Sequence, residues 1–300
     1  MGDIDKERKE AKEEVESLKR LDKKVLKEGG LIAQNDPDYF AIRLKVPVGR
    51  ITPDQLRKVA DVAEKEGRGY VHLSSRQGVE IPWIDKERML DVVEDLKTAE
   101  LYAGSCGPRV RNITGCPGSE RCSFAQIETG ELGKRISDKY VGQKAPHKFK
   151  ISLSGCTNMC SDPVVNDFGI VGRTRPRLVP EKCTGCGLCV RVCRGKSITL
   201  EDNGIPEIDR DTCIDCGFCV LHCPSDAMEK EEHGYTIYIG GRMGRYPQLG
   251  KEIIRFASEE QLFDILEKTL QYFREFGREQ ERLSEVLERN GTEHFRDYVL

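Results

Sequence analysis

The sequence of 300 residues predicts an α+β fold made of several parts. Apolar patterns at residues 36–101 follow the order β-α-β-β-α, which is typical of half of a ferredoxin-like sandwich. Residues 181–229 carry a cysteine run that occurs twice, and they predict a separate insert. Residues 102–180 and 230–300 enclose this insert. Residues 102–180 are rich in Gly, Cys, Arg and Asn and poor in periodicity, and a long stretch of this kind in a compact domain is more often a functional site than a linker.

Local signals place the elements of the first part. Residues 1–35 predict a helical segment, because the Lys- and Glu-rich stretch 3–28 carries apolar residues near helical spacing and ends at Gly29. Thr52 and Gln55 form a capping box around Pro53, which suits the first helical position. The expected elements are a helix at 3–28, a strand bearing Phe40, Ile42, Leu44 and Val46, a helix bearing Leu56, Val59 and Ala63, strands at 70–74 and 79–83, and a helix bearing Met89, Val92, Val93 and Leu96.

Fewer signals mark the remainder of the chain. Residues 149–153 alternate like a strand and lead into Gly155, and residues 235–239 return to a strand pattern. Ser258 and Gln261 predict the cap of a long helix. A charged final helix is expected to end near Asn290.

The composition limits the classes of protein. The net charge is −3, with 48 basic and 51 acidic residues, and this balance does not indicate a nucleic-acid partner. No apolar run approaches the roughly 20 residues of a membrane span. The charged stretch Met1–Glu10 is unlike a secretory signal. We therefore expect a cytoplasmic protein, in which cysteine clusters bind metal more often than they form disulfides.

The insert has the cysteine spacing of a bacterial-type two-cluster ferredoxin. Each run reads C-x2-C-x2-C-x3-C, and in such ferredoxins the fourth cysteine of each run binds the other cluster. Zinc ribbons use separated C-x2-C pairs instead. Arg194 stands where proline usually follows the fourth cysteine, and it would add positive charge near a cluster. The expected [4Fe–4S] ligand sets are Cys183, Cys186, Cys189 and Cys223 for one cluster, and Cys213, Cys216, Cys219 and Cys193 for the other.

A further set of cysteines lies outside the insert. Cys116-x5-Cys122 and Cys156-x3-Cys160 supply four thiolates, enough for one more cubane cluster. Taken alone, this set is also consistent with an ordinary structural cluster. Cys106 is left over, and we expect it to be a small buried residue.

The residues around these cysteines resemble the siroheme-containing sulfite and nitrite reductases. The similarity runs from about residue 36 to the C-terminus and is interrupted only by the insert. The compact size and the insert are most similar to the catalytic subunit of anaerobic, dissimilatory-type sulfite reductases. The matching segments are Ser75-Arg76-Gln77-Gly78, Val110-Arg111-Asn112-Ile113-Thr114-Gly115-Cys116-Pro117, Lys148 to Cys160, Asn166-Asp167-Phe168-Gly169 and Gly240-Gly241-Arg242-Met243-Gly244-Arg245.

The resemblance implies roles for individual residues. Cys116, Cys122, Cys156 and Cys160 would hold a [4Fe–4S] cluster, and Cys160 would bridge it to the siroheme iron. The cations around the substrate would be Arg76, Arg111, Lys148 and Lys150. Siroheme carries eight carboxylates, which arginine recognises well. The candidates for siroheme binding are Arg173, Arg175, Arg177, Arg242 and Arg245, with Asn158 and Cys160 from the cysteine motif.

The function implied is the six-electron reduction of sulfite to sulfide in an anaerobic cell. Nitrite reduction is the alternative on the same scaffold, but relatives in that branch typically replace one of the two lysines by asparagine. A non-catalytic electron-transfer or reductase-like protein is the other alternative. A ferredoxin or a partner subunit would deliver electrons through the insert. A homodimer or higher oligomer would restore the two-copy arrangement of longer relatives.

Overall fold

A computed structural model describes residues 23–300. The chain divides into two compact units, one comprising the chain up to Asn112 with Ser137–Lys148, the other comprising Ile113–Ile136 with Phe149–Leu300. The helix expected at residues 3–28 lies mostly outside the described residues. Within the described residues, α2 (Lys23–Glu28) ends before Gly30, whose φ is +85°.

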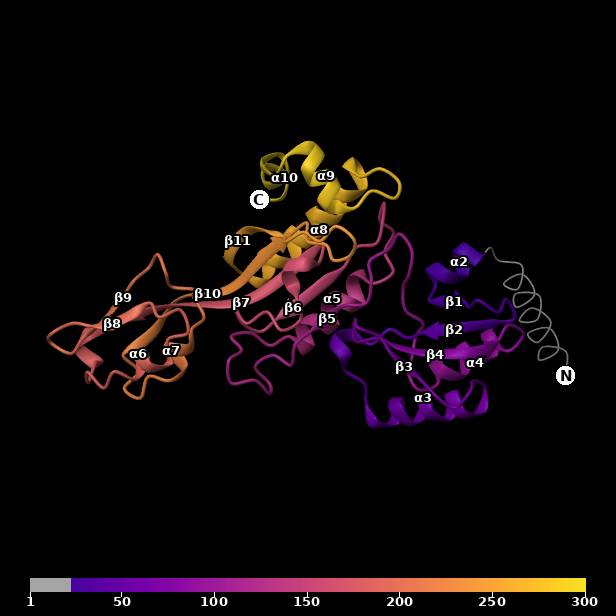
Figure 1. Cartoon of the computed structure of the whole chain (residues 1–300), viewed down its shortest axis with the longest axis horizontal. Helices are drawn as coiled ribbons and strands as arrows, with labels where there is room; N and C mark the ends of the chain where they lie inside the picture. Colours follow the sequence, from indigo (N-terminus) through magenta and orange to yellow (C-terminus); the bar gives the residue numbers. More distant parts are fainter. Residues whose placement is uncertain (1–22) are drawn as a thin grey trace. The chain divides into compact units, whose positions relative to one another are not determined.

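The first unit is built on a four-stranded antiparallel sheet in the order β1-β2-β4-β3 (Figure 1). Its elements are β1 (Leu31–Ala33), β2 (Tyr39–Arg43), a 3-10 turn (Pro47–Gly49), α3 (Pro53–Lys65), β3 (His72–Leu73), β4 (Val79–Asp85) and α4 (Met89–Lys97). Apolar side chains of β2, β4, α3 and α4 form one core. The predicted order β-α-β-β-α is therefore confirmed, with β3 shorter than expected.

The capping box that starts α3 is also confirmed. Gln55 N–H donates to Thr52 Oγ1 at 3.2 Å, and Thr52 N–H donates to Gln55 Oε1 at 3.1 Å. Of the three apolar residues from which this helix was predicted, Leu56 is 51% exposed. The buried stripe of α3 instead contains Val59, Val62 and Ala63.

The second unit contains a five-stranded sheet in the order β11-β10-β7-β6-β5. β5, β6 and β7 pair in parallel, whereas β7, β10 and β11 pair antiparallel. All four residues of β6 are buried, so the expected alternation gives way to the continuous burial typical of a parallel strand. The strands are β5 (Thr114–Gly115), β6 (Ile151–Ser154), β7 (Phe168–Leu178), β10 (Met228–Ile239) and β11 (Lys251–Ala257).

Helices complete this unit. Gln261 N–H donates to Ser258 Oγ at 3.1 Å and starts α8 (Glu259–Phe276), as predicted. α9 (Leu283–Asn290) matches the expected final charged helix, but α10 (Thr292–Val299) follows it. α5 (Gly130–Tyr140) was not expected from the sequence. None of the described helices combines the length and the apolar character needed to cross a membrane.

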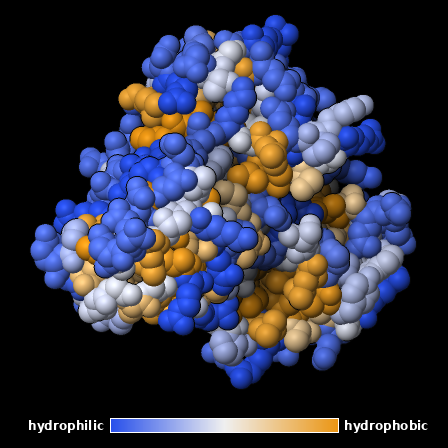
Figure 2. Space-filling model, turned by 60° about the vertical axis from the view of Figure 1, so that its left-hand side comes forward, coloured by the Kyte–Doolittle hydropathy of each residue, from blue (hydrophilic) through white to orange (hydrophobic). Residues whose placement is uncertain are grey.

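The insert extends from the long β7–β10 pair, whose register continues to Met228 opposite Leu178 (Figure 1). It contains a 3-10 turn (Pro180–Lys182), α6 (Leu188–Val192), β8 (Ile198–Leu200), β9 (Pro206–Ile208) and α7 (Phe218–Leu221). Leu200, Ile214 and Leu221 are between 40% and 47% exposed. Figure 2 shows apolar side chains among hydrophilic ones on the side of the molecule that carries the insert.

Candidate functional site

The first thiol set is placed by two neighbouring parallel strands. Thr114 of β5 lies opposite Ser152 of β6, and Gly115 lies opposite Leu153. Because parallel strands end at the same edge of a sheet, the chain segments after β5 and β6 emerge together. Cys116 follows β5 directly, and its N–H donates to Leu153 O at 3.1 Å. The pairing therefore brings the Cys116 segment beside the Cys156 segment.

Gly155 allows these segments to pack closely. Its N–H donates to Cys116 Sγ at 3.0 Å, and its carbonyl accepts from Gln126 N–H at 2.6 Å. A Cβ atom at this position would lie 2.7 Å from the Cβ of Ala125, so a larger residue would separate the loops. Ala125 N–H in turn donates to Cys122 O at 3.1 Å. A glycine thus holds the loop of Cys122 against the other two cysteines.

The four thiols influence one another electrostatically. Burial raises the pKa of the Cys156 thiol, and the thiols of Cys116, Cys122 and Cys160 act in the same direction. Cys160 is exposed, whereas Cys156 is buried. A set of four thiols with a backbone N–H directed at one sulfur suits an iron–sulfur cluster. Cys160 is the one residue of the four that is exposed.

The insert gathers its cysteines around two hollows. One is lined by Cys183, Cys186, Cys189 and Cys223, and the other by Cys193, Cys213, Cys216 and Cys219. Each fourth cysteine therefore lies with the first three of the other run, in the crossed sets that the spacing predicts. Within residues 23–300, no three Cys, His, Asp or Glu side chains converge closely enough to share a single metal ion.

Burial distinguishes the two hollows. Burial raises the pKa of the Cys219 thiol to about 12, and the thiols of Cys216, Cys213 and Cys193 add to the effect. Ser197 N–H donates to Cys193 Sγ at 3.2 Å. In the other hollow, Cys186 is exposed. Both hollows offer the donor set of a [4Fe–4S] cluster, and the one containing Cys219 is more deeply buried.

The four predicted substrate cations belong to different units. Arg76, Arg111 and Lys148 are part of the first unit, and Lys150 is part of the second. Arg76 lies in the turn between β3 and β4 and donates from Nη2 to Asn112 O at 3.0 Å. Arg111 Nη1 donates to Ser105 O at 3.5 Å.

The two lysines flank Phe149, just before β6 begins at Ile151. Phe149 is fully buried, whereas both lysines are only partly buried. Lys150 is fixed through its backbone, because its N–H donates to Asp167 Oδ2 at 2.9 Å. Alternation about a buried residue is consistent with the prediction that both lysine side chains share one face.

The sequence analysis named Asp167 only as part of a matching segment, and it did not single out its partner Arg282. The Asp167 side chain is fully buried and accepts from Arg282 Nη2 at 2.8 and 2.9 Å. Burial raises the pKa of Asp167, and Arg282 opposes this shift. A buried ion pair thus anchors the backbone of Lys150. The two residues lie 115 positions apart, so no local pattern marks the pair.

The predicted siroheme arginines mostly contact groups of the protein. Arg173 is 7% exposed and donates to Ile214 O at 3.0 Å and to the Tyr238 hydroxyl at 2.8 Å. Arg177 pairs with Glu229 at 2.7 Å, and Arg242 pairs with Glu285 at 3.1 Å. Arg245 and Asn158 are exposed. A guanidinium already paired with a carboxylate is less available for carboxylates of a cofactor.

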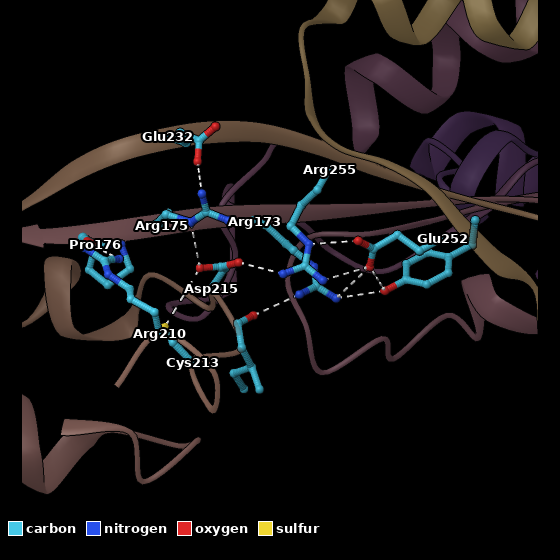
Figure 3. Close-up of polar contacts among 11 residues, drawn as sticks. Arg173, Arg175, Pro176, Arg210, Cys213, Asp215, Glu232, Glu252 and Arg255 are labelled. Atoms are coloured by element: carbon cyan, nitrogen blue, oxygen red, sulfur yellow. Dashed lines mark hydrogen bonds and ion pairs between the residues drawn. The ribbon is translucent and has the colours of Figure 1, made fainter. Parts of the chain in front are cut away.

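Arg175 takes part in a network around Asp215, which lies between Cys213 and Cys216 (Figure 3). The Asp215 side chain is only 4% exposed. It accepts from Arg175 Nε at 3.4 Å and from Arg255 Nη1 at 2.9 Å. Cys213 Sγ lies 3.9 Å from Asp215 Oδ1. These arginines come from β7 and β11, so they hold a cysteine loop of the insert against the sheet.

The remaining cysteine is also accounted for. Cys106 is 1% exposed, as expected for a small buried residue. Its Sγ accepts from Arg43 Nη1 at 2.6 Å, and the same arginine pairs with Glu80 at 2.7 Å. Cys106 therefore belongs to the packing of the first unit.

Two family models match this chain. Residues 106–300 match the family model of the nitrite and sulphite reductase 4Fe-4S domain, and residues 32–99 match that of the nitrite/sulfite reductase ferredoxin-like half domain. The coenzyme F420-dependent sulfite reductase of Methanocaldococcus jannaschii is 38% identical over 90% of this chain. The chain spans only 44% of the length of that relative.

Two further similarities cover most of both proteins. A subunit of the anaerobic sulfite reductase of Salmonella typhimurium is 30% identical, over 86% of this chain and 82% of the relative. The crystal structure of dissimilatory sulfite reductase I has the same fold, with a TM-score of 0.75 at 21% identity over 90% of this chain and 73% of that one. The family models together cover nearly all of the chain beyond residue 31. The chain belongs to the nitrite and sulfite reductase family.

Proposed function

We propose that this chain reduces sulfite to sulfide at a siroheme coupled to a [4Fe–4S] cluster. The observation that carries the proposal is the thiol set that follows β5 and β6. These strands place Cys116 and Cys156 side by side, and Cys160 is exposed beside them. Relatives that cover most of this chain carry the name sulfite reductase, which favours sulfite over nitrite as the substrate.

The chain's residues would divide the work of holding the cofactors. Cys116, Cys122, Cys156 and Cys160 would hold the coupled cluster, and Cys160 would also bind the siroheme iron. When bound, the coupled cluster and the siroheme would supply the electrons that reduce the substrate. Arg245, which is exposed, and Asn158 are the foremost candidates for siroheme contacts, because the other predicted arginines pair with protein groups.

Arg76, Arg111, Lys148 and Lys150 would bind and orient the sulfite anion. Their positive charge would offset the negative charge of sulfite and polarise its S–O bonds. The lysine ammonium groups would supply protons as oxygen leaves as water. Retention of both lysines favours sulfite within this family, and the buried Asp167–Arg282 pair supports the backbone of Lys150.

The insert at residues 181–229 would be the entry for electrons. Its two hollows would each hold a [4Fe–4S] cluster, which with the coupled cluster makes three. The half-domain at 36–101 and the lobe at 102–180 with 230–300 would complete the catalytic body. A ferredoxin or a partner subunit in the cytoplasm would reduce the insert, and two or more copies of the chain would assemble.

Anaerobic turnover of the purified holo-protein with reduced methyl viologen tests this function. We expect a higher kcat/KM for sulfite than for nitrite and stoichiometric sulfide. Lys150→Ala should lower kcat/KM for sulfite, whereas Lys268→Ala, which removes a surface lysine paired with Asp264 on α8, should not. Faster reduction of nitrite, or no turnover of either anion, would contradict the proposal.

A further inference from the structure

Two phenylalanine rings connect the insert with the loop of Cys122. Phe124 and Phe218 stack with their centroids 4.7 Å apart and their planes within 15°. Phe124 lies two residues after Cys122, and Phe218 directly precedes Cys219. Each ring is therefore close in sequence to a cysteine of a different thiol set. This stack is a direct aromatic contact between the two predicted cluster sites.

Arg194 lies over both rings. Its guanidinium carbon is 5.2 Å from the centroid of Phe124 and 5.6 Å from that of Phe218. Such a cation is attracted by the faces of aromatic rings. Arg194 directly follows Cys193, at the position where proline stands after Cys223. A proline could not reach the rings, so the departure from the usual ferredoxin pattern coincides with this contact.

The backbone around the stack is closely packed. Thr174 N–H donates to Asp215 O at 2.9 Å, and Thr174 forms a parallel bridge with Cys216. Gly217 has φ of +69°, and a Cβ there would overlap the side chains of Gln126 and Thr174. We call the hollow of Cys193, Cys213, Cys216 and Cys219 the inner site, because this packing fixes it against the sheet. The hollow of Cys183, Cys186, Cys189 and Cys223, with exposed Cys186, is the outer site.

We propose that the Phe124–Phe218 stack, with Arg194 over it, is the route by which electrons pass from the inner site to the set of Cys116, Cys122, Cys156 and Cys160. Electron transfer is fast across van der Waals contact and slows steeply across a gap. A low-potential one-electron donor of the ferredoxin class reduces the outer site. Each transfer then oxidises one site and reduces the next, outer to inner to coupled, with no bond made and no proton moved.

This inference rests on the proposed function for its cofactors and its direction, but its test does not use sulfite, so a failure of sulfite turnover leaves it unaffected. One electron is injected photochemically into the oxidised holo-protein, and its arrival at the siroheme is followed by the visible absorption bands. The variants are Phe124→Leu, Phe218→Leu and the double substitution, which keep an apolar side chain and remove the rings. Iron and siroheme contents are compared first.

The first unit provides a matched control. Tyr39 and Trp83 pack edge to face at 5.7 Å, and Arg68 lies 3.6 Å from the Trp83 centroid and 5.3 Å from that of Tyr39. This group also combines two rings with one arginine, but contains no cysteine. Tyr39→Leu should leave the electron-transfer rate unchanged.

We expect a severalfold slower arrival of the electron at the siroheme in the double variant, with wild-type iron content. If the double variant loses iron, the single variant that keeps wild-type iron content gives the comparison, because each single variant removes one ring of the stack. A wild-type rate with full iron content would overturn the route. Arg194→Met should lower the midpoint potential of the inner site in an EPR redox titration, and an unchanged potential would overturn the role of the arginine.

Discussion

Replacing Asp215 by Asn tests whether a buried carboxylate fastens the insert to the sheet. Asp215 is 4% exposed and accepts from Arg175 on β7 and from Arg255 on β11 (Figure 3). Glu252 and Asp215 both raise the pKa of Arg255. The substitution keeps the shape of the side chain and removes its charge. Both arginines would then lose one of their two acidic partners.

The size of the effect follows from burial. A hydrogen bond to a charged group contributes about 1.5–3 kcal/mol, and breaking a buried ion pair costs about 3–5 kcal/mol. The side chains of Arg175 and Arg255 are 33% and 36% exposed, so water stabilises them when unpaired. They also keep Glu232 and Glu252 as partners. We therefore expect Asp215→Asn to reduce the free energy that holds the insert on the sheet by about 2 kcal/mol, near the lower end of these ranges.

Native-state hydrogen exchange measures this loss at the contact itself. Thr174 N–H donates to Asp215 O, so its exchange reports opening between insert and sheet. A cost of about 2 kcal/mol corresponds to exchange about thirtyfold faster. Glu232→Gln is the control, because Glu232 also pairs with Arg175 but is 44% exposed and should contribute less than about 1 kcal/mol. Equal exchange in the two variants would refute the reasoning.

The remaining predictions concern the cysteines, one glycine and one surface pair. Cys193→Ser should remove about four irons per chain from the site that also contains Cys213, whereas Cys106→Ser should leave the iron content intact. Loss of the EPR signal assigned to the outer site instead would contradict the crossed arrangement. Gly155→Ala places a Cβ 2.7 Å from that of Ala125 and should lower the free energy of unfolding by about 1–3 kcal/mol, seen as a lower melting temperature. Arg135 donates to Glu259 at 2.6 and 2.7 Å and lowers the pKa of this carboxyl. Ionised Glu259 therefore stabilises the fold at any pH above its ordinary pKa of about 4.5. This contribution is lost as the pH falls through the lowered pKa. Glu259→Gln should therefore destabilise by less than about 1 kcal/mol at neutral pH, with the difference from wild type disappearing in acid; a difference that persists in acid would show another cause.

Strong local signals were sufficient for several elements. The capping boxes at Thr52 and Ser258 start α3 and α8 where the sequence predicts, because both partners of each box lie within four residues. The crossed cysteine sets of the insert also followed from spacing alone. In these cases the interacting groups are close in sequence, or their pairing is fixed by a repeated motif.

Elements without such signals were missed. β5 is two residues long, and β7 is buried along most of its length, so neither length nor alternation marks them. Helical spacing predicts a stripe but not its exact edge, and Leu56 of α3 is exposed. The register of the sheet, which brings Cys116 beside Cys156, depends on strand pairing between distant segments.

The sequence by itself determined the family resemblance, the half-domain order and the grouping of the cysteines, because each depends on residue identity and local spacing. Only the tertiary structure decided which charges meet. Asp167 binds Arg282 across 115 positions, and Asp215 meets Arg255 across 40. It likewise paired Arg175 and Arg177 with acids and stacked Phe124 on Phe218. Such contacts form only when the sheet and the insert have folded, since the free energy of burying a charge or a ring depends on what surrounds it.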